Sequence, residues 1–384
     1  MTDAVSIVTA NFGPLRFVLR DSSDTWSPTI DEINNRDYDY VKLHRLSTYF
    51  DVGIAPFSMG ICFDGTLVLP AVEQFHDRNV ALAKFNQTLT EFLLGGIYCE
   101  AATPDDIGYG TLSYTAYAKV VGSGGGPMAS LHQAFRTKHV GNLDAIKLFH
   151  PESVLVEDLE VGLQSGRSLL ERVGQFPHEQ LLYGTTFYVR KQWAEALIHF
   201  WTVTERLVEI VWEARIIQGS GVITKRRKTF LQDHRTWPIS TKLELLTQKG
   251  LLPVDLLSAL DAVRKVRNDF VHEGVQPTHE TVERALTSCF ELTSLCASDF
   301  TDRSLLASVA SRVKDRCNPE LYPERYQLLN PTHWLALPPL PGDKEWGDRP
   351  YEIVEELMLK PLNNSYRERD NTSCPCKRIL NLRS

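Results

Sequence analysis

Three side chains in the last third of the chain are of types that can act on a phosphodiester. In VRKVRNDFVHEG (263–274), Arg267, Asn268 and His272 follow one another within six residues. A guanidinium can hold a phosphate through paired hydrogen bonds, and an imidazole can carry a proton near neutral pH. Asn268 and His272 stand four residues apart, so on a helix their side chains are neighbours. This set predicts phosphate chemistry by general acid–base catalysis.

The position of Arg267 on the predicted helix argues for a role beyond solvation. At 100° per residue it shares one face with apolar neighbours, namely Leu256, Leu260, Val263 and Phe270. A guanidinium in such a stripe needs an acceptor, a phosphate or a subunit interface, because an unpaired buried charge is costly. Gly274 predicts the end of the helix, whose dipole favours a protonated His272 in the last turn. The alternative is that these polar residues have no chemical role and simply face solvent at the end of the helix.

The elements that must position these residues are helical from about residue 180 to 316. A long amphipathic helix is expected over 190–217, with Trp193, Phe200 and Val208 on its apolar face. Shorter helices are expected over 240–250, with Ser240 as N-cap, and over 253–274, 278–300 and 302–316. The stretch 218–240 is expected to be a loop carrying a basic cluster, Lys225–Lys228. Short connections favour an up-and-down bundle.

Residues 1–145 are expected to form a mixed, β-rich domain. Short runs of β-branched and aromatic residues are separated by Gly, Pro and Asp. One helix is expected within 80–98, where apolar residues recur at helical spacing before Gly95-Gly96. The stretch GSGGGP (122–127) lacks both glycine spacings of nucleotide-binding loops and predicts a flexible turn. The fold class expected is therefore α+β.

Two further segments complete the expected organisation. A helical connector is expected over 146–179, with a helix in 150–176 that has Pro151 near its start. Residues 317–384 are rich in proline and are expected to form a tail that is partly disordered. Cys374 and Cys376 are the only close cysteine pair, and no second ligand pair accompanies them, so we expect no metal.

Composition narrows the class of protein. The chain has 384 residues, 43% hydrophobic and 23% charged, with a net charge of −7, as in a globular protein of two or three domains. Seven cysteines, an odd number, argue against a disulfide scaffold. No leader-like N-terminus and no apolar run of membrane-spanning length is visible. We expect a cytoplasmic protein without membrane attachment. No motif of metalloproteases, serine hydrolases, P-loop NTPases or kinases is found.

The stretch Arg267-Asn268-Asp269-Phe270-Val271-His272 resembles the R-x4–6-H motif of HEPN domains, in the form with Asn after Arg. Its place near the end of the third main helix of a predicted bundle is similar too. The region of about 180–300 resembles the Apea-like HEPN families. This resemblance implies a HEPN-like bundle and a metal-independent endoribonuclease without cofactor, used in anti-phage defence or as a toxin. It implies that Arg267 binds the scissile phosphate, that His272 is the general acid or base, and that Asn268 orients either His272 or the phosphate.

The resemblance and the helix geometry together predict a homodimer. Arg267 and His272 lie about 140° apart on an ideal helix, and one motif carries only one histidine. Two motifs facing each other across a two-fold axis would supply an acid and a base for RNA cleavage to a 2′,3′-cyclic phosphate and a 5′-OH. The N-terminal domain would then sense a trigger, phage-derived or a regulatory partner, or select a target.

Two further predictions concern residues around the motif. Glu205 is a candidate supporting carboxylate, and Arg264 with Lys225, Arg226, Arg227 and Lys228 are candidate RNA contacts. Each has a plain alternative, a surface carboxylate or a solvated loop. For the whole protein, the alternative is a non-catalytic HEPN module that dimerises or binds a nucleotide or protein partner. An antitoxin-like regulator is a third possibility.

Overall fold

The computed structural model describes residues 4–317 except 123, 222, 298 and 299. The chain has an α+β fold, with an antiparallel sheet in its N-terminal part and helices in the rest. The residues up to Cys317 form one compact unit. The proline-rich tail expected over 317–384, apart from Cys317, lies outside the described residues, and so do Cys374 and Cys376. The domain boundaries expected near 145 and 179 stay predictions.

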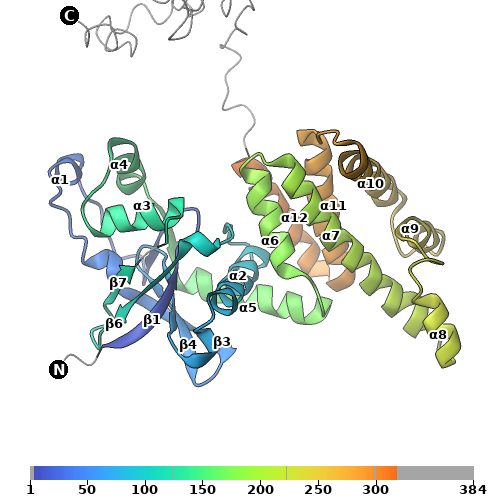
Figure 1. Ribbon diagram of the computed structural model, residues 1–384, viewed down its shortest axis with the longest axis horizontal. Helices are drawn as coiled ribbons and strands as arrows, with labels where there is room; N and C mark the ends of the chain where they lie inside the picture. The colour runs from blue at the N-terminus through green and yellow to red at the C-terminus, as the bar shows by residue number, and fades with distance from the viewer. Residues whose placement is uncertain (1–3, 123, 222, 298–299, 318–384) are drawn as a thin grey trace, which may run out of the picture. The chain divides into compact units, whose positions relative to one another are not determined.

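A six-stranded antiparallel sheet organises the N-terminal part, in the order β3-β4-β5-β1-β6-β7 (Figure 1). Its central strand, β1, pairs Val8 with Leu69 of β5 on one side and with Tyr109 of β6 on the other. A separate two-stranded parallel sheet joins β2 to β8. The strands are β1 (Val5–Ala10), β2 (Arg16–Leu19), β3 (Leu46–Ile54), β4 (Phe57–Cys62), β5 (Leu67–Pro70), β6 (Ile107–Leu112), β7 (Ala118–Gly122) and β8 (Glu152–Leu155).

The helices follow mainly after the sheet. They are α1 (Ile30–Asn34), α2 (Arg78–Leu94), α3 (Pro127–Arg136), α4 (Asn142–Phe149), α5 (Val156–Val173), α6 (His178–Val189), α7 (Trp193–Trp212), α8 (Lys225–Leu231), α9 (Ile239–Gln248), α10 (Val254–Glu273), α11 (His279–Ala297) and α12 (Phe300–Arg316). The helix expected within 80–98 is confirmed as α2. The expected helix in 150–176 begins later, at Val156, because residues 152–155 pair with β2 as β8.

The two faces of the sheet bury alternate residues of β1, as the period of a strand requires. Val8 and Ala10 belong to the main hydrophobic core, whereas Ile7 packs in a smaller cluster on the other face. Helix α2 packs its buried Phe85 and Phe92 into the main core, where Phe92 meets Phe50 of β3 with ring centres 5.6 Å apart. The alternation of side chains along β1 thus explains how the strand is covered on both faces.

Helix α2 also joins the sheet to the helical part through a close crossing with α5 (Figure 1). A Cβ on Gly166 would lie 1.8 Å from the carbonyl oxygen of Glu91, and one on Gly95 would lie 1.8 Å from that of Gly162. Only glycine leaves room for two backbones to approach this closely. The main core continues across the crossing into the bundle as far as α12.

In the helical part, α10 lies beside two long helices, α7 and α11. Helix α7 packs against α6 and α11, and α10 packs against α7, α9 and α11 (Figure 1). After Trp212 the axis of α7 continues through one π-helical turn, Glu213–Ile217. Helices joined by short connections, such as α6 and α7 or α10 and α11, therefore pack against each other.

Two local expectations for the helical part were wrong. The stretch 218–240 is not all loop, because Thr224 caps a short helix, α8, by accepting from the backbone N–H of Arg227. Ser240 does not cap α9. That helix begins one residue earlier, at Ile239, with Pro238 in the N-cap position. The ring of Pro238 fixes its φ angle, and proline has no backbone N–H that would need a partner at the start of a helix.

Candidate functional site at the C-terminal end of helix α10

Helix α10 begins and ends where the sequence indicates. Pro253 occupies its N-cap, and Gly274 ends it in the left-handed conformation, at φ 73°. This backbone favours glycine because it has no Cβ. The residues Leu256, Leu260 and Val263 are buried, which confirms the apolar stripe over the first half of the helix. Beyond Val263 the same stripe is only half-buried, at Arg267 and Phe270.

Arg267 is held partly inside the protein with an incomplete set of partners. Its Nη1 donates to Oδ1 of the adjacent Asn268 at 3.0 Å. Its Nε is buried and is one of four such side-chain atoms without a hydrogen-bond partner among the described residues. Most buried polar atoms in proteins are satisfied, and an unsatisfied one costs about 1–3 kcal/mol. The guanidinium is therefore positioned without being neutralised by a carboxylate.

His272 lies one turn further, exposed in the last turn of α10. The structure brings it onto the same helix end as Arg267 and Asn268. Among the described residues no hydrogen bond joins Asn268 to His272, since the Asn268 oxygen accepts from Arg267 instead. Two apolar side chains border this end of the helix, Val271 and Val275, which are 49% and 51% exposed.

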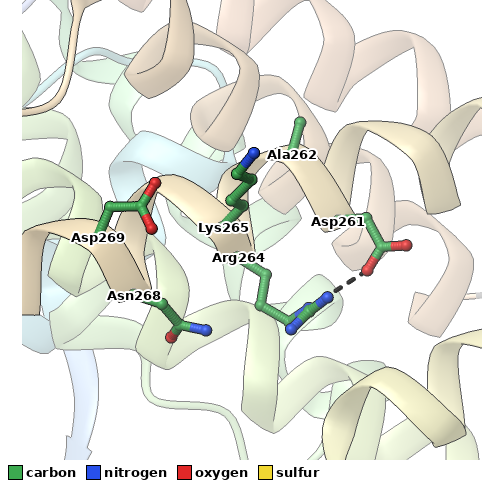
Figure 2. A pocket seen from close by; sticks show the side chains of 6 residues that line it. All are labelled: Asp261, Ala262, Arg264, Lys265, Asn268 and Asp269. Carbon is green, nitrogen blue, oxygen red and sulfur yellow. Dashed lines mark hydrogen bonds and ion pairs between the residues drawn. The ribbon is translucent and has the colours of Figure 1, made fainter. Parts of the chain in front are cut away.

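A surface hollow of about 420 Å³ lies along the polar side of α10. Six residues line it: Asp261, Ala262, Arg264, Lys265, Asn268 and Asp269. Figure 2 shows Arg264 and Asn268 on one side of the helix, with Arg264 turned toward Asp261. That pair forms an i,i+3 ion pair, with Nε 3.2 Å from Oδ1. Arg264 is thus already bound to a carboxylate, which weakens its case as a free phosphate contact.

The supporting residue Glu205 is engaged within its own helix. Its Oε1 accepts from the indole N–H of Trp201 at 2.6 Å, one turn earlier on α7. This contact fixes Trp201, which is buried in the core. Among the described residues, Glu205 forms no hydrogen bond or ion pair with Arg267 or His272, so its role near the motif stays a prediction.

The basic cluster lies on α8 and is exposed throughout. Lys228 forms an ion pair with Glu213 at 3.5 Å. Lys225, Arg226 and Arg227 have no ion pair among the residues that the structure describes. The four cations therefore lie on a helix rather than on a loop. In the sequence, α8 and α10 are separated by α9.

Sequence reasoning missed a buried polar cluster in the N-terminal part. Asp64, in the turn between β4 and β5, accepts two hydrogen bonds from Arg136 of α3, each of 2.7 Å. His132 Nδ1 lies 3.0 Å from the same carboxylate. Burial opposes ionisation of Asp64, but Arg136 and His132 outweigh it and hold its pKa well below the usual range. The cluster joins α3 to the sheet and shows no opening to solvent.

Two cysteines of the described chain illustrate why these thiols are poor candidates for chemistry. Cys62, beside Arg136, is fully buried, and burial raises its pKa to about 12. Burial likewise raises the pKa of Cys296 to about 12. A thiol that stays protonated near neutral pH is a weak nucleophile. Within the described residues, no three or more His, Cys, Asp or Glu side chains gather as metal ligands would.

Comparison with known proteins yields no match. No family model matches the sequence, and no curated protein or solved structure is significantly similar to it. No helix in the described part of the chain combines the length and the hydrophobicity needed to cross a lipid bilayer.

Proposed function

We propose that the chain is a metal-independent endoribonuclease of the HEPN type, with a site built from the α10 ends of two identical subunits. The observation that carries the proposal is the state of Arg267. Its guanidinium is half-buried and oriented by Asn268, yet among the described residues its Nε lacks a partner and no carboxylate forms an ion pair with it. A cation held in this way is prepared for an anionic ligand, and a phosphodiester supplies one.

The exposed His272 complements this cation. In the proposed reaction the 2′-oxygen of RNA attacks the neighbouring phosphorus, and the bond from phosphorus to the 5′-oxygen breaks. One histidine accepts the proton of the 2′-OH, and the other gives a proton to the leaving 5′-oxygen. The products are a 2′,3′-cyclic phosphate and a 5′-OH. Arg267 would stabilise the negative charge that develops on the phosphate oxygens.

A second subunit would supply the second histidine that the reaction needs and would cover the exposed valines beside His272. One α10 carries one histidine, whereas the reaction needs an acid and a base. The exposed Val271 and Val275 flank His272 and would lose contact with water in a two-fold interface. The HEPN-like bundle and the homodimer are parts of the same proposal, as is a role in defence or as a toxin.

The test is RNA cleavage by the purified full chain in the presence of EDTA. We expect wild type to cut single-stranded RNA and leave cyclic phosphate ends, and we expect His272→Ala and Arg267→Ala to be inactive. His139→Ala, which removes another exposed histidine, is the matched control and should cut like wild type. A dimer that cuts no RNA would favour the non-catalytic HEPN module instead.

A further inference from the structure

Helix α8 and the turn after it form a surface of cations around an exposed aromatic ring. We call this surface the α8 platform and define it by six exposed residues: Lys225, Arg226, Arg227, Lys228, Phe230 and Arg235. Phe230 is 51% exposed, which is unusual for a ring of its size. The net charge of the whole chain is −7, so this basic surface stands against the overall charge.

The backbone of the α8 platform is fixed by two buried or half-buried indoles. Trp212 Nε1 donates to the carbonyl oxygen of Leu231 at 2.9 Å, and Trp237 Nε1 donates to that of Phe230 at 3.1 Å. The two indole rings lie 5.5 Å apart and tie α8 to the end of α7. The platform is therefore a built surface whose backbone is held while its side chains reach solvent.

Stability of the fold does not explain these residues. Cations in the first turn of a helix oppose its dipole, so Lys225, Arg226 and Arg227 cost stability where they stand. Of these cations, Lys228 alone forms an ion pair with a described residue, Glu213. Phe230 meets Trp237 edge to face, with ring centres 5.6 Å apart, but the exposed half of its ring contributes nothing to the core. The residues fit better as contacts to a ligand that is both anionic and aromatic.

We propose that the α8 platform binds single-stranded RNA, with Phe230 stacking on an unpaired base and Arg226 and Arg227 contacting phosphates. Nucleic acid is the partner that joins regular negative charge to flat aromatic faces. In a duplex the base faces are covered by neighbouring base pairs, so a stacking ring selects a single strand. The inference rests on the proposed ribonuclease function for its substrate class, but binding can be measured separately from cleavage.

The experiment measures binding of a fluorescein-labelled 12-nucleotide oligouridylate by anisotropy. His272→Ala in the full chain serves as the parent, so that the RNA stays intact. We expect Phe230→Ala to weaken binding about tenfold, in the range found for loss of one stacked base. Phe230→Tyr, which keeps a ring, should stay within about twofold of the parent. Arg226→Glu with Arg227→Glu should weaken binding more than tenfold and flatten its dependence on salt.

Matched variants away from α8 control for nonspecific effects. Tyr114→Ala removes an exposed ring that is 84% exposed, and Lys119→Glu with Lys249→Glu reverses two exposed cations. Both should bind RNA like the parent. Circular dichroism checks that each variant is folded.

Several results would overturn the inference. These are unchanged affinity in both α8 variants, equal binding of a duplex of the same length, no RNA binding by the parent, or binding to anionic phospholipid vesicles without binding to RNA. Failure of the proposed nuclease function looks different. In that case wild type would cut no RNA, while RNA binding would still depend on Phe230.

Discussion

At the scale of single residues, Arg267 and Arg136 show two opposite ways to bury a guanidinium. Arg136 is fully buried and forms two hydrogen bonds with Asp64, so its charge is paired inside the protein. Arg267 is half-buried and donates to the neutral amide of Asn268, and its Nε finds no partner in the part of the chain that the structure describes. A paired guanidinium stabilises the folded protein. An unpaired buried one lowers its stability, and a ligand that pairs with it removes that loss.

This contrast gives a first prediction, which concerns stability. Arg267→Met should leave the free energy of unfolding unchanged or raise it by about 1 kcal/mol, because it removes an unsatisfied buried atom. The same variant should lose RNA cleavage by about 100-fold or more. Arg136→Met is the comparison and should lower the free energy of unfolding by about 3–5 kcal/mol, since it leaves Asp64 buried and unpaired. Urea denaturation measures both. A large loss of stability in Arg267→Met would show that the residue is structural.

A second prediction concerns acid stability. Arg136 and His132 lower the folded-state pKa of Asp64, despite its burial, so its carboxylate stabilises the protein above the ordinary carboxyl pKa near 4. That contribution is lost as pH falls below about 4–5 and toward the lower folded value. Stability measured from pH 6 to pH 3 should therefore fall more steeply in wild type than in Asp64→Asn. Asp37→Asn, at an exposed carboxylate, should follow the wild-type slope.

If Asp64→Asn proves too unstable to study, Asp64→Asn combined with Arg136→Met removes the buried charge as well. The double variant should be more stable than Asp64→Asn alone, because a buried ion pair replaced by apolar atoms is close to neutral. A double variant less stable than either single one would contradict this account of the pair.

At the scale of elements, the contact between α2 and α5 depends on residues that are not apolar at all. Gly95 and Gly166 let the two helix backbones meet, and Gly162 leaves room for the Ile97 side chain. The Arg167 guanidinium adds an ion pair to Glu91 at 3.3 Å. Because the main core continues through this crossing, the contact links the sheet to the helices that carry the motif.

A third prediction tests this crossing. Gly166→Ala should lower the free energy of unfolding by about 3 kcal/mol, because its Cβ would collide with the Glu91 carbonyl and the helices would have to separate. Gly122→Ala is the matched control, since no atom lies within 4 Å of its added Cβ, and its effect should stay within about 0.5 kcal/mol. Equal effects in thermal or urea denaturation would show that the crossing is not close-packed.

Local patterns in the sequence predicted the elements that depend on local physics. Helical spacing located α2 and α10, and Pro253 and Gly274 marked the two ends of α10 correctly, since caps are set by the backbone of a few residues. The pairing of β2 with β8 could not be predicted, because the two strands lie more than 130 residues apart along the chain. Helix α8 could not be predicted from local pattern, because it is short and is fixed by distant Trp212.

For the candidate site as well, local spacing predicted one part, and the other part depends on packing between distant segments. The placement of Arg267, Asn268 and His272 on one helix end followed from spacing alone. The half-burial of Arg267 and its bond to Asn268 depend on how deeply α10 packs, which the helix wheel does not give. The Asp64 cluster was missed because its members come from a turn and a helix far apart in sequence, although an Asp64-Gly65 turn between two apolar strands is a faint signal.

At the scale of the whole molecule, the proposed site is complete only when two chains meet. Val271 and Val275 lie in or just after the last turn of α10 and are about half exposed in the single chain. Apolar side chains beside a catalytic candidate fit a two-fold interface in which each subunit faces the same surface of its copy.

A fourth prediction follows for the assembly. Sedimentation velocity of wild type should give a mass twice that of one chain, and Val271→Asp with Val275→Asp should shift it toward monomer, because charges in an apolar interface are costly. Cleavage should fall in parallel with the dimer fraction. Val5→Asp, at another exposed valine that is 59% exposed, is the control and should leave the mass unchanged. An active monomer would contradict the composite site.

The most direct measurement is the chemistry itself. Purified wild type, Arg267→Ala and His272→Ala are incubated with single-stranded RNA in EDTA, and the product ends are identified by mass spectrometry. The account predicts 2′,3′-cyclic phosphate and 5′-OH ends from wild type and intact RNA with both variants. Equal cleavage by all three proteins, or cleavage by wild type only after divalent metal is added, would contradict it.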